Sequence, residues 1–148
     1  MQVLQEQEDL NLVMSGEKPM MLLVLDPPEE KFRSCTLKSL SKDVVYFCER
    51  WDKYCVNVVV FNKVALEKLL PEINKSQSRW NFDSVEMLIE QIRDRYRRRE
   101  EYKTLDLNFR KDYVLVESIC FGYPRGCIDE FLKEAVSTKL RPDRIVHE

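Results

Sequence analysis

The amino-acid sequence predicts an α/β protein in which helices flank a mainly parallel sheet of about three to five strands. Residues 55–62, CVNVVVFN, form the most concentrated β-branched run in the chain, long enough for one buried strand. Amphipathic segments flank this run on both sides, as expected where helices cover the faces of a parallel sheet. Strands alternate with helices along the chain, which is the order of a layered α/β fold.

Length and composition indicate one domain. The chain has 148 residues, of which 44% are apolar and 34% are charged. We assign residues 19–141 to a single α/β domain, residues 1–18 to either a docked helix or a frayed tail, and residues 142–148 to a C-terminal tail. The net charge of −2 gives no overall attraction to nucleic acid or to an anionic membrane. No apolar run is long enough for a membrane span and no secretion signal is evident, so we expect a protein of the cytoplasm or nucleus.

In the first half of the chain, residues 20–25, MMLLVL, are expected to form a buried strand that ends before Pro27 and Pro28. Residues 36–52 carry apolar side chains at helical spacing and predict a long helix. The strand at residues 56–62 follows. A short helix from Lys63 to Leu70 comes next and is expected to stop at Pro71.

In the second half, a helix is predicted from Asp83 to about Tyr102. Asp83 is a good N-cap, and Glu86 stands three residues later, as in a capping box. Residues 104–109 alternate polar and apolar side chains, and residues 113–118, YVLVES, are strongly apolar. Together they predict a C-terminal antiparallel hairpin, with an extended loop as the alternative for its first half. A last helix is expected over residues 125–140.

This order of elements resembles that of a von Willebrand factor A-type domain over residues 20–140. In that family a metal site follows the first strand, with the pattern Asp-x-Ser-x-Ser. The corresponding run here, residues 26–30, reads DPPEE, which keeps Asp26 and loses both hydroxyls. The resemblance therefore implies a variant without the metal, and such variants are commonly assembly modules.

The residue content argues against most enzymes. The only histidine is His147, close to the end of the sequence, and the chain has only three glycines. An internal histidine base and a glycine-rich phosphate loop are therefore both absent from the sequence, and we expect a non-enzyme without cofactors.

The cysteines are expected to be reduced thiols. There are five: Cys35, Cys48, Cys55, Cys120 and Cys127. An odd number without a secretion signal is typical of a reducing compartment. The last four form two pairs with a common spacing that a four-thiolate zinc site could use, but zinc ligands in a pair usually stand two to four residues apart.

Three places in the sequence contain residues that could bind a metal ion, an anion or a partner molecule. Asp26 and Glu117 are expected at the carboxyl ends of strands, where two carboxylates could hold Mg²⁺. The turn at residues 122–126 could bind an anion through backbone N–H groups and Arg125. The third place is an arginine-rich helix end with two tyrosines. Its candidate binding residues are Arg93, Arg95, Tyr96, Arg97, Arg98, Arg99, Tyr102 and Lys103.

The arginine-rich helix end suggests two functions. Arginines beside exposed aromatic rings are used on single-stranded nucleic acid, whereas arginines alone also suit an acidic protein surface. Helix-dipole stabilisation and pairing with neighbouring carboxylates would explain the same cations without any partner. We interpret the chain as a protein-interaction module or small scaffold subunit of an intracellular complex. The alternative is a nucleic-acid-binding or nuclease-like domain that adds a divalent metal at Asp26 and Glu117.

Overall fold

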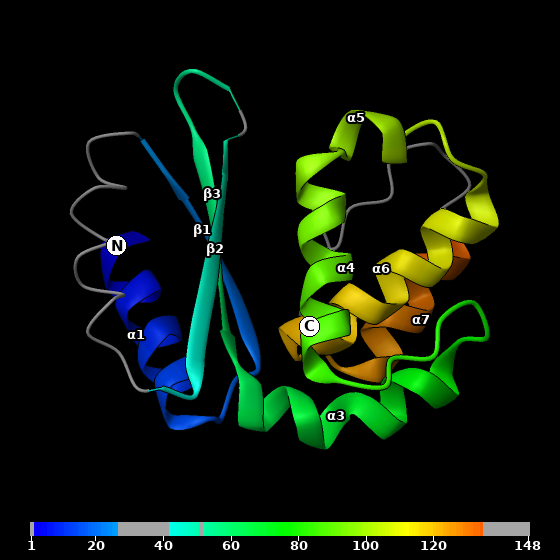
Figure 1. Cartoon of the computed structure of the whole chain (residues 1–148), viewed down its shortest axis with the longest axis horizontal. Coiled ribbons are helices and arrows are strands. Elements are labelled where there is room, and N and C mark those ends of the chain that lie inside the picture. Colours follow the sequence, from blue (N-terminus) through cyan, green and yellow to red (C-terminus); the bar gives the residue numbers. More distant parts are fainter. Residues whose placement is uncertain (1, 27–41, 51, 135–148) are drawn as a thin grey trace. The chain divides into compact units, whose positions relative to one another are not determined.

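A computed structural model describes residues 2–26, 42–50 and 52–134. The chain divides into two compact units, residues 1–67 and residues 68–148, which are described separately (Figure 1). Among the helices of the described residues, none combines the length and the apolar character needed to cross a bilayer.

The first unit is built on a three-stranded sheet in the order β1-β3-β2. The strands are β1 (Met20–Leu25), β2 (Val44–Arg50) and β3 (Val56–Asn62). Both β1 and β2 pair with β3 in antiparallel fashion. The predicted mainly parallel sheet of three to five strands is therefore wrong. The turn between β2 and β3 is too short for a crossover, so the two strands must run in opposite directions.

That turn is held by Asp52. Its Oδ1 accepts hydrogen bonds from the backbone N–H groups of Tyr54 and Cys55 at 2.7 and 2.8 Å. Aspartate commonly stabilises turns in this way because its short side chain reaches the backbone two residues on.

Strand β2 replaces the second part of the helix predicted over residues 36–52, and residues 36–41 lie outside the described residues. The segment VVYFCER is rich in β-branched and aromatic side chains, which favour a strand. Val44 and Phe47 are buried three residues apart, which is also a helical spacing. Apolar positions three and four apart therefore resemble a helix, although they belong to the two faces of one strand.

The central strand β3 is buried along its whole length. The side chains of Val58 and Val60 belong to one face, and those of Val59 and Phe61 belong to the other, because successive strand residues alternate. All four are at most 1% exposed, which confirms the predicted core.

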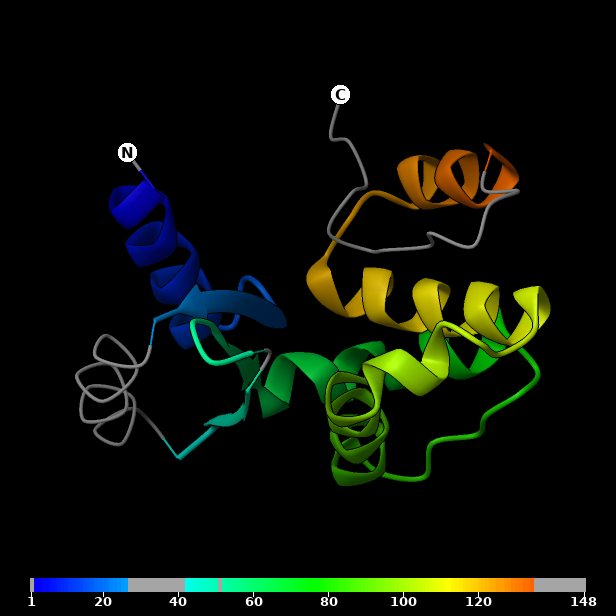
Figure 2. The ribbon, with the colours of Figure 1, turned by 90° about the horizontal axis from the view of Figure 1, so that it is seen from above.

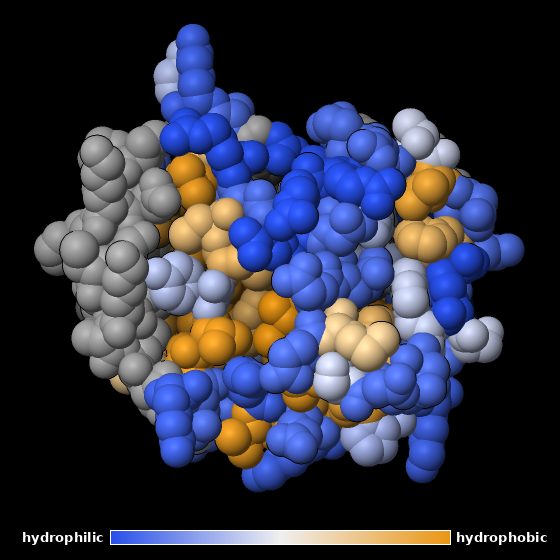
Figure 3. Space-filling model, in the orientation of Figure 1, coloured by the Kyte–Doolittle hydropathy of each residue, from blue (hydrophilic) through white to orange (hydrophobic). Residues whose placement is uncertain are grey.

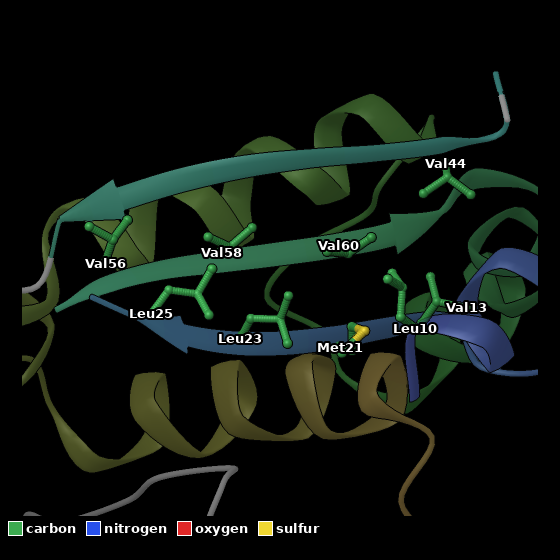
Figure 4. Close-up of a cluster of buried hydrophobic side chains, with 9 residues drawn as sticks. All are labelled: Leu10, Val13, Met21, Leu23, Leu25, Val44, Val56, Val58 and Val60. Carbon is green, nitrogen blue, oxygen red and sulfur yellow. The ribbon is translucent and has the colours of Figure 1, made fainter. Parts of the chain in front are cut away.

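Helix α1 (Gln2–Ser15) docks on one face of the sheet, so the docked form is observed rather than the frayed tail. Leu10 and Val13 of α1 pack against the sheet (Figure 4). The sheet side of this core consists of Met21, Leu23, Leu25, Val44, Val56, Val58 and Val60. A buried hydrogen bond from Asn62 Nδ2 to the Val13 carbonyl, 2.8 Å long, fastens the end of α1 to β3.

Helix α3 (Lys63–Ser76) begins directly after β3, and its first turn is capped by Asn62, whose Oδ1 accepts from the Ala65 N–H at 3.0 Å. The helix was expected to stop at Pro71, but it continues through that proline. Beyond the proline, Ile73 is fully buried, and the Ser76 hydroxyl donates to the Glu72 carbonyl at 2.7 Å. Burial of Ile73 therefore outweighs the helix-breaking tendency of proline.

The second unit contains helices α4 (Val85–Arg97), α5 (Arg99–Tyr102), α6 (Leu107–Phe121) and α7 (Arg125–Glu134). Ser84, not the predicted Asp83, caps α4, because its hydroxyl accepts from the Met87 N–H. The helix predicted to reach Tyr102 is interrupted at Arg98, whose φ and ψ of −113° and 34° are not helical. Figure 2 shows α6 between α7 and the α4–α5 pair.

Helix α6 overturns the predicted C-terminal hairpin. Asp106 caps it by accepting from the Phe109 N–H at 2.9 Å, and Gly122 ends it with a positive φ of 81°. Every residue from Tyr113 to Phe121 is buried. A helix buried on all sides shows no polar face, so its apolar run resembles a buried strand. The predicted start of the last helix is confirmed at Arg125, while residues 135–140 lie outside the described residues.

Candidate functional site

The arginine-rich segment forms the end of α4 and all of α5. Residues 93–103, called the cationic segment below, contain six cations and three carboxylates, an excess of three positive charges in a chain of net charge −2. Arg97, Arg98 and Lys103 are exposed, whereas Arg93, Arg95 and Arg99 are half-buried. Figure 3 shows hydrophilic residues gathered over α4 and α5. The segment is therefore a local cationic surface on an acidic protein.

Ion pairs hold this surface in place. Arg98 bonds Asp94 Oδ2 at 3.1 Å and Glu101 Oε2 at 2.7 Å, so one guanidinium joins α4 to α5 across the helix break. The hydrogen bond to Glu101 is the main reason that the pKa of Arg98 is raised. Lys103 pairs with Glu100 at 3.1 Å. Exposed pairs of this kind contribute little stability, but they restrict where the charges lie.

Tyr102 is part of the scaffold beneath this surface and not of the surface itself. It is only 7% exposed, its hydroxyl donates to Asp94 Oδ2 at 2.8 Å, and it accepts from Gln91 Nε2 at 2.8 Å. Burial, and next its bond to Asp94, raises the pKa of Tyr102 to about 12. Its ring makes edge contacts with Phe109 and Tyr113 of α6. The ring is therefore already occupied by protein contacts.

Tyr96 is likewise buried, at 4% exposure, and its hydroxyl donates to Glu117 Oε1 at 2.7 Å. Glu117 lies within α6 and is fully buried, so its predicted place at the end of a strand is wrong. The Arg95 guanidinium lies 4.9 Å from the ring centre of Tyr96 and 5.5 Å from that of Tyr113. The buried carboxylate thus accepts a hydrogen bond from Tyr96, and the Arg95 guanidinium lies against the rings of Tyr96 and Tyr113.

The charge of Glu117 also affects the pKa values of two neighbouring groups, Tyr113 and Cys120. The pKa of Tyr113 is raised, first by burial and then by the negative charge of Glu117. The pKa of the Cys120 thiol is raised by the same two causes in the same order. Both groups therefore stay protonated near neutral pH, and Cys120 is an unreactive thiol. The role of this cluster is structural, because the hydrogen bond from Tyr96 to Glu117 links α4 to α6.

The two metal candidates belong to different units of the chain. Asp26 is exposed after β1 in the first unit, and Glu117 is buried in the second. Among the residues that the structure describes, no group of three or more histidine, cysteine, aspartate or glutamate side chains is placed to hold a metal ion. None of Cys48, Cys55, Cys120 and Cys127 forms a disulfide in the described part, and Cys35 and His147 lie outside it.

The turn at residues 122–126 is engaged within its own unit. Arg125 pairs with Asp129 at 3.3 Å and donates to the Ser76 hydroxyl at 3.0 Å. Gly122 serves as the C-cap of α6. Arg125 therefore has partners that account for its position without an anion.

Sequence reasoning missed the aromatic stack that supports the helices. Trp80 contacts both Phe82 and Phe109, and the Arg79 guanidinium lies over the Phe109 ring at 4.7 Å while pairing with Asp112 at 3.2 Å. Residues 79–82 and residues 109–112 are far apart in the sequence, and no local spacing signals the contact between these two segments.

No protein-family model, no curated protein and no solved structure matches the chain. These comparisons do not bear on the resemblance to a von Willebrand factor A-type domain, which stays a prediction. The parallel strand order on which it depends is not seen among the described strands.

Proposed function

We propose that this chain is a non-enzymatic interaction module of an intracellular complex, which binds an acidic protein partner through the cationic segment. The observation that supports this proposal is the excess of three positive charges at residues 93–103 in a chain of net charge −2. Such charge separation gives a surface that attracts carboxylates and speeds encounter with an acidic partner.

The burial of both tyrosines favours protein over single-stranded nucleic acid. Proteins that bind single strands present aromatic faces on which bases stack. Tyr96 and Tyr102 are 4% and 7% exposed, and both hydroxyls are bonded within the second unit. Without exposed rings, the segment keeps its charge but loses the stacking contribution, about 1–3 kcal/mol per base.

The local scaffold suits a preformed docking surface. Tyr102 bonds Asp94, and Asp94 in turn pairs with Arg98. Because these contacts fix the backbone between α4 and α5, part of the ordering entropy of the surface is already lost before binding. Arginine also matches carboxylates with two parallel hydrogen bonds, which favours an acidic protein surface.

The test is charge reversal at two exposed cations, Arg97→Glu with Lys103→Glu, because reversal at Arg98 would also break the junction between α4 and α5. The matched control is Lys42→Glu with Lys68→Glu, which changes the net charge equally at exposed lysines elsewhere. Partners captured by the full chain from a nuclease-treated extract should be lost with the first variant and kept with the control. Binding should weaken moderately as salt rises.

An oligonucleotide titration separates the alternative. A steep log-log dependence of affinity on salt for a single-stranded oligonucleotide, abolished by the same reversal, would establish nucleic-acid binding instead. If the reversal and the control behave alike, the cationic segment is only a solvated helix end and the proposal is wrong.

A further inference from the structure

Among the described strands, none pairs with the outer edge of β1. Strand β1 is the outer strand of the sheet in the first unit, beside β3 (Figure 4). The Asn62 N–H donates to the Pro19 carbonyl at 2.9 Å, and Met20 stands opposite Phe61. In an antiparallel ladder, residues bonded to the neighbouring strand alternate with residues whose backbone groups point away. The N–H and C=O groups of Met20, Leu22 and Val24 therefore point away from β3.

Within its own residues, β1 carries none of the usual sequence features that protect an edge strand against pairing. Residues 20–25 read MMLLVL, without charge or proline, and their register with β3 runs without a bulge. Natural edge strands are commonly shielded by lysine, proline, a bulge or a cover, because their outward backbone groups otherwise pair with another strand. The opposite edge strand, β2, ends in Glu49 and Arg50. The two edge strands thus differ in their content of charged residues, since β2 has two and β1 has none.

Exposed apolar side chains accompany the open edge. Val24 of β1 is 40% exposed, and Leu12 and Met14 of α1 are 38% and 41% exposed. They are three of the six large hydrophobic side chains that are exposed among the described residues. Leu12 and Met14 belong to the helix that covers one face of β1 and β3, whereas Val24 belongs to the opposite face, because Met21, Leu23 and Leu25 alternate with it and pack against α1.

We propose that β1 pairs with β1 of a second copy of this chain, in antiparallel fashion, about a two-fold axis at Leu22. Leu22 then faces Leu22 of the other copy, and Met20 faces its Val24. The two three-stranded sheets become one six-stranded sheet, and six outward N–H groups, three from each copy, gain partners.

A second copy fits this edge better than a foreign strand does. Self-pairing of an uncharged strand brings no like charges together, whereas an ordinary charged edge would repel itself. A two-fold contact uses the same β1 edge of both copies, so no unpaired β1 edge remains for a third copy. The outer edges of the six-stranded sheet are then the two β2 strands, which contain charged residues.

The experiment measures the mass of the full chain by sedimentation equilibrium over a range of concentrations. The wild type should reach twice the 17.7 kDa of one chain and stop there. Val24→Lys, at an exposed position, should raise the dimer dissociation constant by at least about tenfold. Met87→Lys is the matched control, since Met87 is 47% exposed on α4, and it should leave the dimer unchanged.

Leu22→Pro is the second variant. It removes the outward N–H at the two-fold axis but no ladder bond to β3, and proline is tolerated at such edge positions. Folded Leu22→Pro, verified by circular dichroism, should be monomeric. A wild type that stays monomeric at all concentrations, an assembly that grows beyond the dimer, or a dimer that survives both edge variants would each overturn the proposal.

Discussion

The bond between Tyr96 and Glu117 is expected to be a major stabilising contact of the second unit. Tyr96→Phe removes the hydroxyl that donates to Glu117 Oε1 at 2.7 Å and leaves the ring in place. Because Glu117 is fully buried, water cannot replace the lost donor. The variant therefore isolates one hydrogen bond to a buried carboxylate.

The expected magnitude follows from that burial. Hydrogen bonds to charged groups contribute about 1.5–3 kcal/mol, and a buried acceptor that loses its partner lies at the upper end. We expect Tyr96→Phe to lower the free energy of unfolding by about 2–3 kcal/mol. In a Glu117→Gln background the acceptor is neutral, and the same substitution should have an effect of about 0.5–1.5 kcal/mol. The difference is the coupling energy of the pair.

Urea unfolding followed by circular dichroism at the helix band measures these quantities for all four members of the double-mutant cycle. Tyr54→Phe is the control, because Tyr54 is 66% exposed, and it should change stability by less than about 0.5 kcal/mol. An effect of Tyr96→Phe below about 0.5 kcal/mol, or one of equal size in both backgrounds, would refute the view that a buried carboxylate is held by this hydroxyl.

Three further predictions concern the core, the alkaline range and a helix cap. Phe61→Ala should lower the free energy of unfolding of the first unit by about 3–5 kcal/mol in urea titrations, because Phe61 is fully buried; a loss below about 1 kcal/mol would contradict its core position. Folding raises the pKa of Tyr102 to about 12 from 10.0, so the unfolded state loses this proton first. The associated stability is present below pH 10 and is lost as the pH rises towards 12, and Tyr102→Phe should reduce the fall of the urea midpoint over that range. An unchanged pH profile would count against the raised pKa. Asp106→Ala should lower the free energy of unfolding by about 1 kcal/mol, because α6 loses its N-cap. The control is Asn108→Ala, at an exposed position in the first turn of α6, which should change it by less than about 0.5 kcal/mol. Equal effects of the two substitutions would show that Asp106 is not the cap.

For the binding surface, the sequence identified the cations but not their surroundings. The excess of positive charge at residues 93–103 is a property of composition and needs no structure. Burial of Tyr96 and Tyr102 depends on α6, which the sequence analysis replaced by a hairpin. The interpretation of the two rings as stacking surfaces therefore failed, because exposure is decided by which element packs against them.

Local signals were sufficient for some elements of the fold. The run at residues 56–62 and the run at residues 20–25 are each dense in apolar side chains and bounded by polar residues, and both are strands. The start of α4 was found to within one residue, because capping side chains act on neighbouring backbone groups and leave a local pattern.

Only the tertiary structure decided the direction of the strands and the nature of the most buried segments. Residues 113–118 and 44–50 are both apolar and rich in β-branched or aromatic side chains, yet the first is helix and the second is strand. Residues 113–118 are all buried and so lose the alternation between polar and apolar faces that would report their period, whereas the half-buried residues 44–50 carry apolar side chains on both faces of a strand. The conformation of each segment is then set by the elements it packs against, which are α4, α5 and α7 for the first and β3 for the second.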